Sequence, residues 1–335
     1  RLLARQVERA REMGFRAKAG SELEMYLFRE SYESARKKGY RDLETFGSYI
    51  EDYNILQGTK EEPVVGAIVR GLDASGIPME GSKGEWGPGQ QELNTCYGDV
   101  LEQADANVLT KHAAKEIAGR QGFAVTFMAK WNEKLAGSSM HQHLSLWNAA
   151  GDENLFAGQS APGAEGSDLF RWFLGGWMAH AEELAALCAP TVNSYKRFQS
   201  ASFAPTSVAW SRDNRTVGFR VVGQGDSLRI ECRIPGADAN PYLAYSAALA
   251  SGLDGISMRI EPPAAFDGDA YAAKALPRVP ATLRDATDRL AASSFAREAF
   301  GGEFVDHYIH FLRTEQRKFD EAVTDWEKAR FFERG

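Results

Sequence analysis

The chain has 335 residues, of which 44% are hydrophobic, and a formal net charge of −7. Its length allows one large domain or two smaller ones. The acidic balance argues against a nucleic-acid or anionic-membrane binder, and no apolar run approaches the roughly 18 residues of a membrane span. Three scattered cysteines, Cys96, Cys188 and Cys232, form no disulfide framework or Cys-x-x-Cys zinc motif, so we expect reduced thiols and a cytoplasmic protein.

The first part of the chain predicts helices and strand-like runs separated by polar or glycine-rich segments. Glu61 and Glu62 give one of these helices an acidic start, and Pro63 is expected in its first turn. In chain order, the pattern predicts a helix at 1–15, a strand at 16–29, a loop or hairpin insertion at 30–57, a helix at 60–74, a strand with a glycine-rich loop at 76–95, a helix at 99–120, and strands at 122–130 and 139–147.

The second part is richer in helices, and one Pro/Ala/Gly-rich stretch in it predicts a surface loop. The expected order is one or two apolar helices at 160–188, two strand-like runs at 207–234, an alanine-rich helix behind Pro241 at 240–260, the surface loop at 261–283 and mostly helix at 283–330. Because the strands cluster rather than alternate strictly with helices, the order favours an α+β domain with an antiparallel sheet over a doubly wound fold.

Polar side chains recur at a spacing of two residues in three of the predicted strands. Residues i and i+2 share one face of a strand, so each set can point into the same space. Taken singly, each set has a plainer explanation, such as an exposed strand face, a structural histidine pair or a surface ladder. Together, and with Glu85 and Glu92 flanking a Gly-Pro-Gly loop, they favour one polar cavity. The three sets are Glu22 with Glu24, His141 with His143, and Arg229 with Glu231 and Arg233.

The residue types in this predicted cavity indicate its chemistry. Carboxylates in weakly charged surroundings are costly unless a cation neutralises them. Carboxylate oxygens with an imidazole suit Mg²⁺ or Mn²⁺ better than zinc, which favours thiolate and imidazole. Arginines beside the same carboxylates suggest an anionic substrate, and phosphate is the obvious candidate.

Five motifs in order make the chain resemble the catalytic domain of the glutamine synthetase family, over nearly its whole length. We therefore expect one catalytic domain over 1–335, in which a curved antiparallel sheet lines the active site and helices surround it. The motifs are Glu22-Leu23-Glu24, Gly87-Pro88-Gly89-Gln90-Gln91-Glu92, Met140-His141-Gln142-His143, Asn193-Ser194-Tyr195-Lys196-Arg197, and Asn214-Arg215-Thr216 leading to Arg229-Ile230-Glu231-Cys232-Arg233.

The resemblance implies a role for each matching residue. It implies two clusters of metal ligands, a set of glutamate contacts, phosphate-binding arginines and nucleotide contacts. Glu24, Glu85 and Glu92 look like ligands of one divalent ion, and Glu22, His141 and Glu231 like ligands of a second; Arg197, Arg233 and Gly137 look like glutamate contacts; Arg215, Arg220 and Arg229 look like phosphate binders, His143 like a group that stabilises developing charge, and Tyr97 and Ser145 like nucleotide contacts.

The reaction implied by this resemblance joins glutamate to an amine at the expense of ATP. Phosphorylation turns the poorly electrophilic γ-carboxylate into γ-glutamyl phosphate, which the amine then attacks. Two or three Mg²⁺ or Mn²⁺ ions per site and the arginines would offset the charge of ATP beside an anion. The implied partners are glutamate, ATP and an amine, with no nucleic acid and no membrane.

Two positions depart from the pattern of the ammonia-using members. Their flap carries a glutamate that closes the site and removes a proton from ammonium, and the same distance from Arg197 leads here to Phe203. An aromatic ring cannot act as that base, but it can line a pocket for a larger amine. Ala136 replaces an asparagine expected before Gly137. The sequence therefore favours an organic amine, such as a polyamine, ethanolamine or another monoamine, and Glu133 is either an amine contact or a solvated turn residue.

Two alternatives remain open at this stage. One is an ammonia-using glutamine synthetase in which another residue replaces the flap base. The other is a non-catalytic relative with a structural or regulatory role, although all six metal-ligand positions are filled. The resemblance also implies a dodecamer of two stacked hexameric rings and an N-terminal β-grasp domain, which is absent from this chain. Tyr271 lies near a regulatory tyrosine of some members, but its surroundings match poorly and predict an ordinary loop residue.

Overall fold

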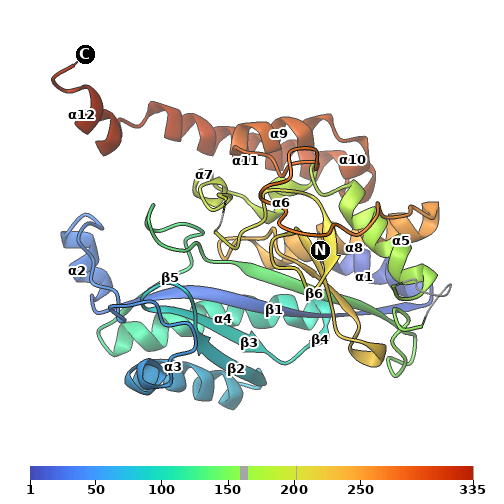
Figure 1. The fold of residues 1–335 in the computed structure, drawn as a ribbon, viewed down its shortest axis with the longest axis horizontal. Helices are drawn as coiled ribbons and strands as arrows, with labels where there is room; N and C mark the ends of the chain where they lie inside the picture. The colour runs from blue at the N-terminus through green and yellow to red at the C-terminus, as the bar shows by residue number, and fades with distance from the viewer. Residues whose placement is uncertain (159–164, 201, 335) are drawn as a thin grey trace.

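The computed structural model describes residues 1–158, 165–200 and 202–334, and a large mixed sheet forms their centre (Figure 1). Within these residues the sheet has nine strands in the order β2-β3-β1-β6-β9-β8-β7, and β4 and β5 also pair with β1. The strands are β1 (Phe15–Phe28), β2 (Met79–Gly84), β3 (Gln90–Thr95), β4 (Gly98–Asp99), β5 (Ala124–Thr126), β6 (Met140–Asn148), β7 (Trp210–Arg212), β8 (Phe219–Val222) and β9 (Arg229–Cys232).

The pairing confirms the predicted antiparallel sheet with one exception. β1 pairs antiparallel with β3 and β6, and β6 with β9, whereas β7 and β8 pair in parallel. The segment 207–234 also holds three short strands rather than the two expected. Asp213 has a left-handed backbone, and the turn that follows it separates β7 from β8.

Twelve helices surround the sheet in the described residues. α1, α4 and α8 contact one another, and α1 and α4 also contact β1. Tyr245 of α8 donates a hydrogen bond to the carbonyl of Gly20 on β1, at 3.0 Å. The helices are α1 (Leu2–Glu12), α2 (Tyr32–Lys37), α3 (Ile55–Ala74), α4 (Val100–Arg120), α5 (Asp168–Ala179), α6 (Ala185–Cys188), α7 (Val192–Tyr195), α8 (Pro241–Met258), α9 (Leu283–Ala292), α10 (Ser294–Phe300), α11 (Gly302–Glu321) and α12 (Asp325–Phe331).

Side chains of β1 alternate between the hydrophobic core and the polar side of the sheet. Leu23, Met25 and Leu27 are buried in the largest hydrophobic cluster. Glu22 and Glu24, which alternate with Leu23 and Met25, project from the opposite face because successive side chains of a strand point to opposite sides. The alternation predicted from the sequence therefore holds, and apolar packing on one face fixes where the carboxylates lie on the other.

The C-terminal third adds a second hydrophobic cluster, built from α6 and α8 to α11. α12 lies beyond the end of α11, away from the sheet (Figure 1), and its Asp325 forms an ion pair with Arg41. Trp326 on α12 is 64% exposed. Among the described residues, no helix is long and apolar enough to span a membrane.

Two predictions for the segment between β1 and β2 need correction. The polar stretch 30–57, expected as a loop or hairpin insertion, is irregular over 38–54 but also contains the short helix α2, capped by the side chain of Ser31. Helix α3 begins at Ile55 and not near residue 60, because Asn54 caps it by accepting a hydrogen bond from the backbone of Gln57. Pro63 consequently lies inside α3 instead of in its first turn.

Candidate active site

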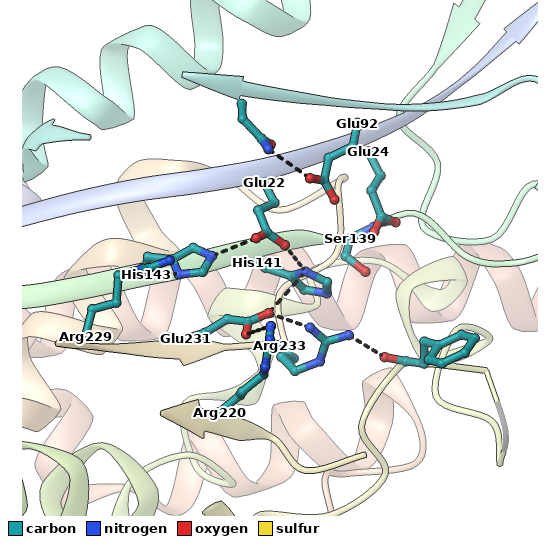
Figure 2. Close-up of polar contacts among 12 residues, drawn as sticks. Glu22, Glu24, Glu92, Ser139, His141, His143, Arg220, Arg229, Glu231 and Arg233 are labelled. Atoms are coloured by element: carbon teal, nitrogen blue, oxygen red, sulfur yellow. Dashed lines mark hydrogen bonds and ion pairs between the residues drawn. The ribbon is translucent and has the colours of Figure 1, made fainter. Parts of the chain in front are cut away.

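Three glutamates from neighbouring strands form the first carboxylate cluster. Glu24 on β1 lies directly opposite Glu92 on β3 in the antiparallel register, and Glu85 follows the end of β2. One carboxylate oxygen from each can be chosen so that all three lie within 4.8 Å of one another. Glu24 and Glu92 are buried, and Figure 2 shows them side by side above Ser139.

The second cluster joins Glu22, Glu231 and the two histidines of β6. The register places Glu22 opposite His141, and His143 opposite Glu231. Nδ1 of His141 is 2.9 Å from Glu22 and 3.5 Å from Glu231, and Nε2 of His143 is 3.2 Å from Glu22. Figure 2 shows this group converging beneath the first cluster. Both histidines therefore contact the carboxylates. By the spacing of possible ligand atoms, His143, Glu22 and Glu231 form a group that could hold a metal ion, with one atom of each within 4.8 Å of the others.

Arg229 defines the orientation of His143. Its Nε donates to Nδ1 of His143 at 3.2 Å, while Nε2 of the same ring faces the carboxylate of Glu22. An imidazole that accepts at Nδ1 carries its proton on Nε2. His143 is thus held as a hydrogen-bond donor at the edge of the carboxylate cluster.

The first cluster concentrates negative charge in a buried place. Burial, and next the Glu92 carboxylate, raise the pKa of Glu24 to about 7. Burial, followed by Glu24 and Glu92, raises the pKa of Glu85 to about 9. The Lys83 ammonium lies 2.5 Å from Glu92 and offsets part of this charge. A divalent cation with a preference for oxygen ligands fits this donor set and would remove the remaining repulsion.

The second cluster is neutralised by its own cationic neighbours. Burial raises the pKa of Glu231, but Arg233, His141 and His143 together outweigh burial, and the pKa falls to about 2. Burial likewise opposes ionisation of Glu22, and contacts with His141 and His143 reverse the effect, so its pKa is below the usual range. Within the described part of the chain, Nε2 of the buried His141 has no hydrogen-bond partner. Two ionised carboxylates beside Nδ1 of His141 also suit a divalent ion.

Metal binding is expected to stabilise the protein more strongly as the pH rises. Glu24 and Glu85 have a pKa above the ordinary 4.5 in the folded protein, so the fold binds extra protons and the metal-free protein loses stability between about pH 5 and 9. A divalent ion replaces those protons. Melting temperatures measured at about pH 6 and about pH 9 should show a gain with Mg²⁺ that is several degrees larger at the higher pH. An equal gain at both values would contradict this electrostatic account.

Two cavities meet at these clusters. The first, of about 240 Å³, is lined by the first cluster and by Glu22 and His141 of the second, together with Gly137, Phe203, Arg215, Arg220 and Arg233. The second, of about 540 Å³, is lined by Lys18, Tyr97, Ser145, Trp147 and Arg229, among others. Both share Glu22 and Lys83. Groups bound in the two cavities would therefore meet where the carboxylates and arginines converge.

Arginines surround the junction, as the sequence predicted. Nη1 of Arg220 is 3.0 Å from Glu231, and its other nitrogens bond Asp213. Arg233 bonds Glu231 and donates to the carbonyl of Phe203 at 3.2 Å. Arg215 lines the first cavity and Arg229 the second. These positions allow the guanidinium groups to contact an anion lying between the cavities.

Arg197 is buried behind the wall of the first cavity. It is 1% exposed, donates to Ser139 Oγ at 3.1 Å and bonds the carbonyl of Ile234. Among the described residues that line the first cavity, Arg233 and Gly137 are present and Arg197 is not. A Cβ at Gly137 would stand 2.5 Å from Cγ of Arg197 and 2.7 Å from the carbonyl oxygen of Ala129, so glycine is needed where the Arg197 side chain packs against this backbone. Its two Nη donors are thus used inside the protein, whereas its buried Nε has no hydrogen-bond partner among the described residues.

The second cavity contains two residues that the sequence analysis missed. Nζ of Lys18 lies 3.7 Å from the ring centre of Trp147 and 5.8 Å from that of Tyr97. Nε1 of Trp147 donates to Ser145 Oγ at 2.9 Å, which fixes the indole. Two aromatic rings beside a lysine suit a heteroaromatic base attached to phosphates. Trp147 could have been predicted from its position two residues after Ser145 on β6, because this spacing places both side chains on one face of the strand.

The aromatic rim of the first cavity includes the expected Phe203 and further residues that were not anticipated. Phe203 is 49% exposed, and its ring meets that of Trp86 edge to face at 5.8 Å. Asp52 and Tyr53 line the same cavity. Glu133 is exposed in a turn and is not among the described lining residues, which favours its interpretation as a solvated residue.

Comparison with known proteins identifies the family. Residues 1–331 match the glutamine synthetase catalytic domain. The chain is 46% identical over 333 residues to γ-glutamylethanolamide synthetase of Streptomyces coelicolor, covering 99% of this chain and 71% of the relative. It is 37% identical over 337 residues to glutamate–isopropylamine ligase of a Pseudomonas species, covering 99% and 72%. The chain therefore belongs to the glutamine synthetase family.

A solved structure supports the same relationship at the level of the fold. The ligand-free form of the protein GmaS superposes with a TM-score of 0.87 at 30% identity, covering 99% of this chain and 76% of that one. Glutamine synthetase of Thermotoga maritima is 32% identical over 337 residues, covering 98% of this chain and 75% of that relative. The α+β fold predicted from the sequence is thus confirmed.

Proposed function

We propose that the protein is an ATP-dependent ligase that joins the γ-carboxylate of glutamate to an organic amine. The observation that carries this proposal is the junction of the two cavities, where two carboxylate clusters and three arginines surround shared space. The aromatic Phe203, in the place of the flap base of ammonia-using relatives, supports an organic amine. The relative with 46% identity is named for the product γ-glutamylethanolamide, and the relative with 37% identity for the substrate isopropylamine.

The reaction has two steps. A γ-carboxylate oxygen of glutamate attacks the γ-phosphorus of ATP, and the bond from that phosphorus to the bridging oxygen of ADP breaks. The amine nitrogen then bonds to the acyl carbon of γ-glutamyl phosphate, the carbon–oxygen bond to phosphate breaks, and the nitrogen loses its proton to a base. Phosphorylation provides the leaving group that a carboxylate lacks.

Each side chain has a task in this scheme. Arg215, Arg220 and Arg229 contact the phosphates, and His143 donates its Nε2 proton toward developing negative charge. Arg233 and the backbone of Gly137 hold glutamate in the first cavity, while Tyr97 and Ser145 contact the nucleotide in the second. Arg197 supports this wall from within. The metal ligands are Glu24, Glu85 and Glu92 for one ion, and Glu22, His141 and Glu231 for another.

The bound metals, two or three Mg²⁺ or Mn²⁺ ions per site, would neutralise and align the phosphates of ATP. We further propose that the chain is one catalytic domain over 1–335 that acts within a homo-oligomer, a dodecamer of two stacked hexameric rings, in the cytoplasm. The exposed apolar side chains of α12 are consistent with burial against other subunits.

Phosphate release across an amine panel tests the proposed function. The full-length protein with ATP, Mg²⁺ and glutamate is expected to release phosphate with ethanolamine or another organic amine at least about tenfold faster than with ammonium, because Phe203 offers ammonium no charge or base. The panel also includes isopropylamine, putrescine and spermine. Strong turnover with ammonium alone would identify an ammonia-using glutamine synthetase, and no release with any amine would favour a non-catalytic relative.

A further inference from the structure

Two buried carboxylates lie behind the loop that joins Glu85 to Glu92. Glu51, in the segment before α3, is 2% exposed, and Glu61 on α3 is 1% exposed. In the part of the chain that the structure describes, neither belongs to a candidate metal cluster and neither lines one of the two cavities. Their burial therefore has no explanation in the site already described.

Both carboxylates meet at the side chain of Gln91. Its Nε2 donates to Glu51 at 3.0 Å and to Glu61 at 2.5 Å. The two carboxylates also lie within hydrogen-bonding reach of each other. Gln57, one turn before Glu61 on α3, donates to the other oxygen of Glu61 at 2.9 Å. Four side chains thus form one buried polar network.

The groups that face this network supply little positive charge. Arg29, directly after β1, acts on Glu61, but its side chain is 45% exposed and pairs with Glu44 at 3.4 Å. On β1, the hydroxyl of Tyr26 faces Glu51 and donates to a backbone carbonyl at 2.8 Å. Among the described residues, no ion pair includes Glu51 or Glu61. The two carboxylates are therefore not neutralised by a neighbouring cation.

Two buried carboxylates in contact cannot both stay ionised without such a cation. Burial, and next the Glu61 carboxylate, raise the pKa of Glu51 to about 8, and burial also raises the pKa of Glu61. Asp52, the residue after Glu51, lines the first cavity instead. One proton therefore remains on the pair near neutral pH.

The pair holds the loop that carries two ligands of the first carboxylate cluster. The backbone N–H of Gly89 donates to Glu51 at 2.5 Å. Gly89 has a φ of 71°, and a Cβ there would stand 2.8 Å from the carbonyl oxygen of Leu27, so the loop packs closely at this point. Gln91 directly precedes Glu92 on β3. Because successive side chains of a strand point to opposite faces, holding Gln91 on one face sets the direction of Glu92 on the other.

We propose that Glu51 and Glu61 share one proton, and that this carboxyl–carboxylate pair positions the loop between Glu85 and Glu92 for the divalent ion. With the proton in place, one carboxyl group donates to the other carboxylate, and both hold the loop from inside. Once that proton is lost to solvent, two adjacent negative charges repel each other, and the contacts of Glu51 with the loop weaken. Both are positioning residues, and the inference rests on the proposed function only for the metal site.

Glu51→Gln copies the protonated state at every pH. The Oε1 of glutamine accepts from Gly89 and its Nε2 donates to Glu61, while Nε2 of Gln91 keeps another acceptor in the carbonyl of Gln90, at 3.2 Å. The parent gains stability from its raised folded-state pKa below about pH 4.5 and loses it as the pH rises to about 8. The variant has no such group. Without metal, the melting temperature of the full-length variant relative to the parent should therefore be several degrees higher at about pH 9 than at about pH 6.

Glu62→Gln is the matched control for this measurement. It makes the same change of charge on α3, one residue after Glu61, but Glu62 is 59% exposed and pairs with Arg70. Its melting temperature relative to the parent should be the same at both pH values within about 1 °C, because an exposed ion pair contributes little.

Binding of Mg²⁺, measured by calorimetry without ATP, glutamate or amine, tests the positioning. At about pH 9, Glu51→Gln should bind Mg²⁺ about tenfold more tightly than the parent, because a group with a pKa of about 8 then keeps its proton in only about a tenth of the molecules. At about pH 6 the two affinities should agree within about twofold. Glu51→Ala removes the contacts with Gly89 and Gln91 and should weaken binding at both pH values.

The outcomes separate the shared proton from the proposed metal site. A Glu51→Gln protein that melts below the parent by the same amount at both pH values would show that Glu51 is an ionised carboxylate, and would overturn the inference. Parent-like Mg²⁺ affinity of this variant at about pH 9 would overturn the positioning role. A parent protein that bound no divalent ion would refute that role together with the proposed metal site, whereas the melting temperatures would still decide whether the proton is shared.

Discussion

Replacing Glu231 by alanine is expected to abolish turnover and to lower the free energy of unfolding by roughly 3–5 kcal/mol, the usual cost of breaking a buried ion pair. Glu231 is 0% exposed and lies between the guanidinium groups of Arg220 and Arg233. Without it, both cations lose their buried partner, and His141 loses one of its two carboxylate neighbours. Urea denaturation and amine-dependent phosphate release would measure the two losses.

Asp213, a solvent-exposed ion-pair partner of Arg220, provides the control for this prediction. Asp213 also pairs with Arg220, but its side chain is 73% exposed, and exposed ion pairs contribute at most about 1 kcal/mol. Asp213→Asn should therefore unfold nearly as the parent protein does. A Glu231→Ala protein with parent-like stability would show that the buried charges reorganise without cost, contrary to the network in Figure 2.

The polar face of the sheet could be predicted from the sequence because a strand alternates its side chains. Glu22 and Glu24 share a face by spacing alone, and apolar Leu23 and Met25 identify the opposite one. The spacing does not give the register between strands that are distant in the chain. That Glu22 lies opposite His141, and Glu24 opposite Glu92, follows from pairing across more than a hundred and more than sixty residues.

The residues that sequence analysis missed lie mainly where backbone conformation, not periodicity, places the side chain. Asp52 and Tyr53 reach the first cavity through a left-handed turn that no local pattern specifies. Both residues lie in a turn within the predicted loop or hairpin insertion, and α3 begins earlier than predicted because Asn54 caps it. Arg197 fits a motif of the family, yet its position depends on tertiary packing that the motif does not encode.

Introducing glutamate at position 203 should shift the enzyme toward ammonium. Phe203 lines the first cavity beside Trp86, so a carboxylate there would attract ammonium and could accept its proton, as the flap glutamate of ammonia-using relatives does. We expect the kcat/KM for ammonium to rise at least about tenfold, which is modest for an added general base. The kcat/KM for ethanolamine should fall, because the aromatic contact with its carbon chain is lost.

Phe203→Gln separates the effect of charge from the effect of removing the ring. Glutamine has the shape of glutamate but neither its charge nor its basicity, and both variants share the same backbone strain at a φ of 58°. Both should therefore lose ethanolamine turnover, whereas the glutamate variant alone should gain ammonium turnover, with the pH dependence of a titrating carboxylate. Equal ammonium rates in the two variants would mean that residue 203 controls access to the cavity by size, and that the base lies on another residue.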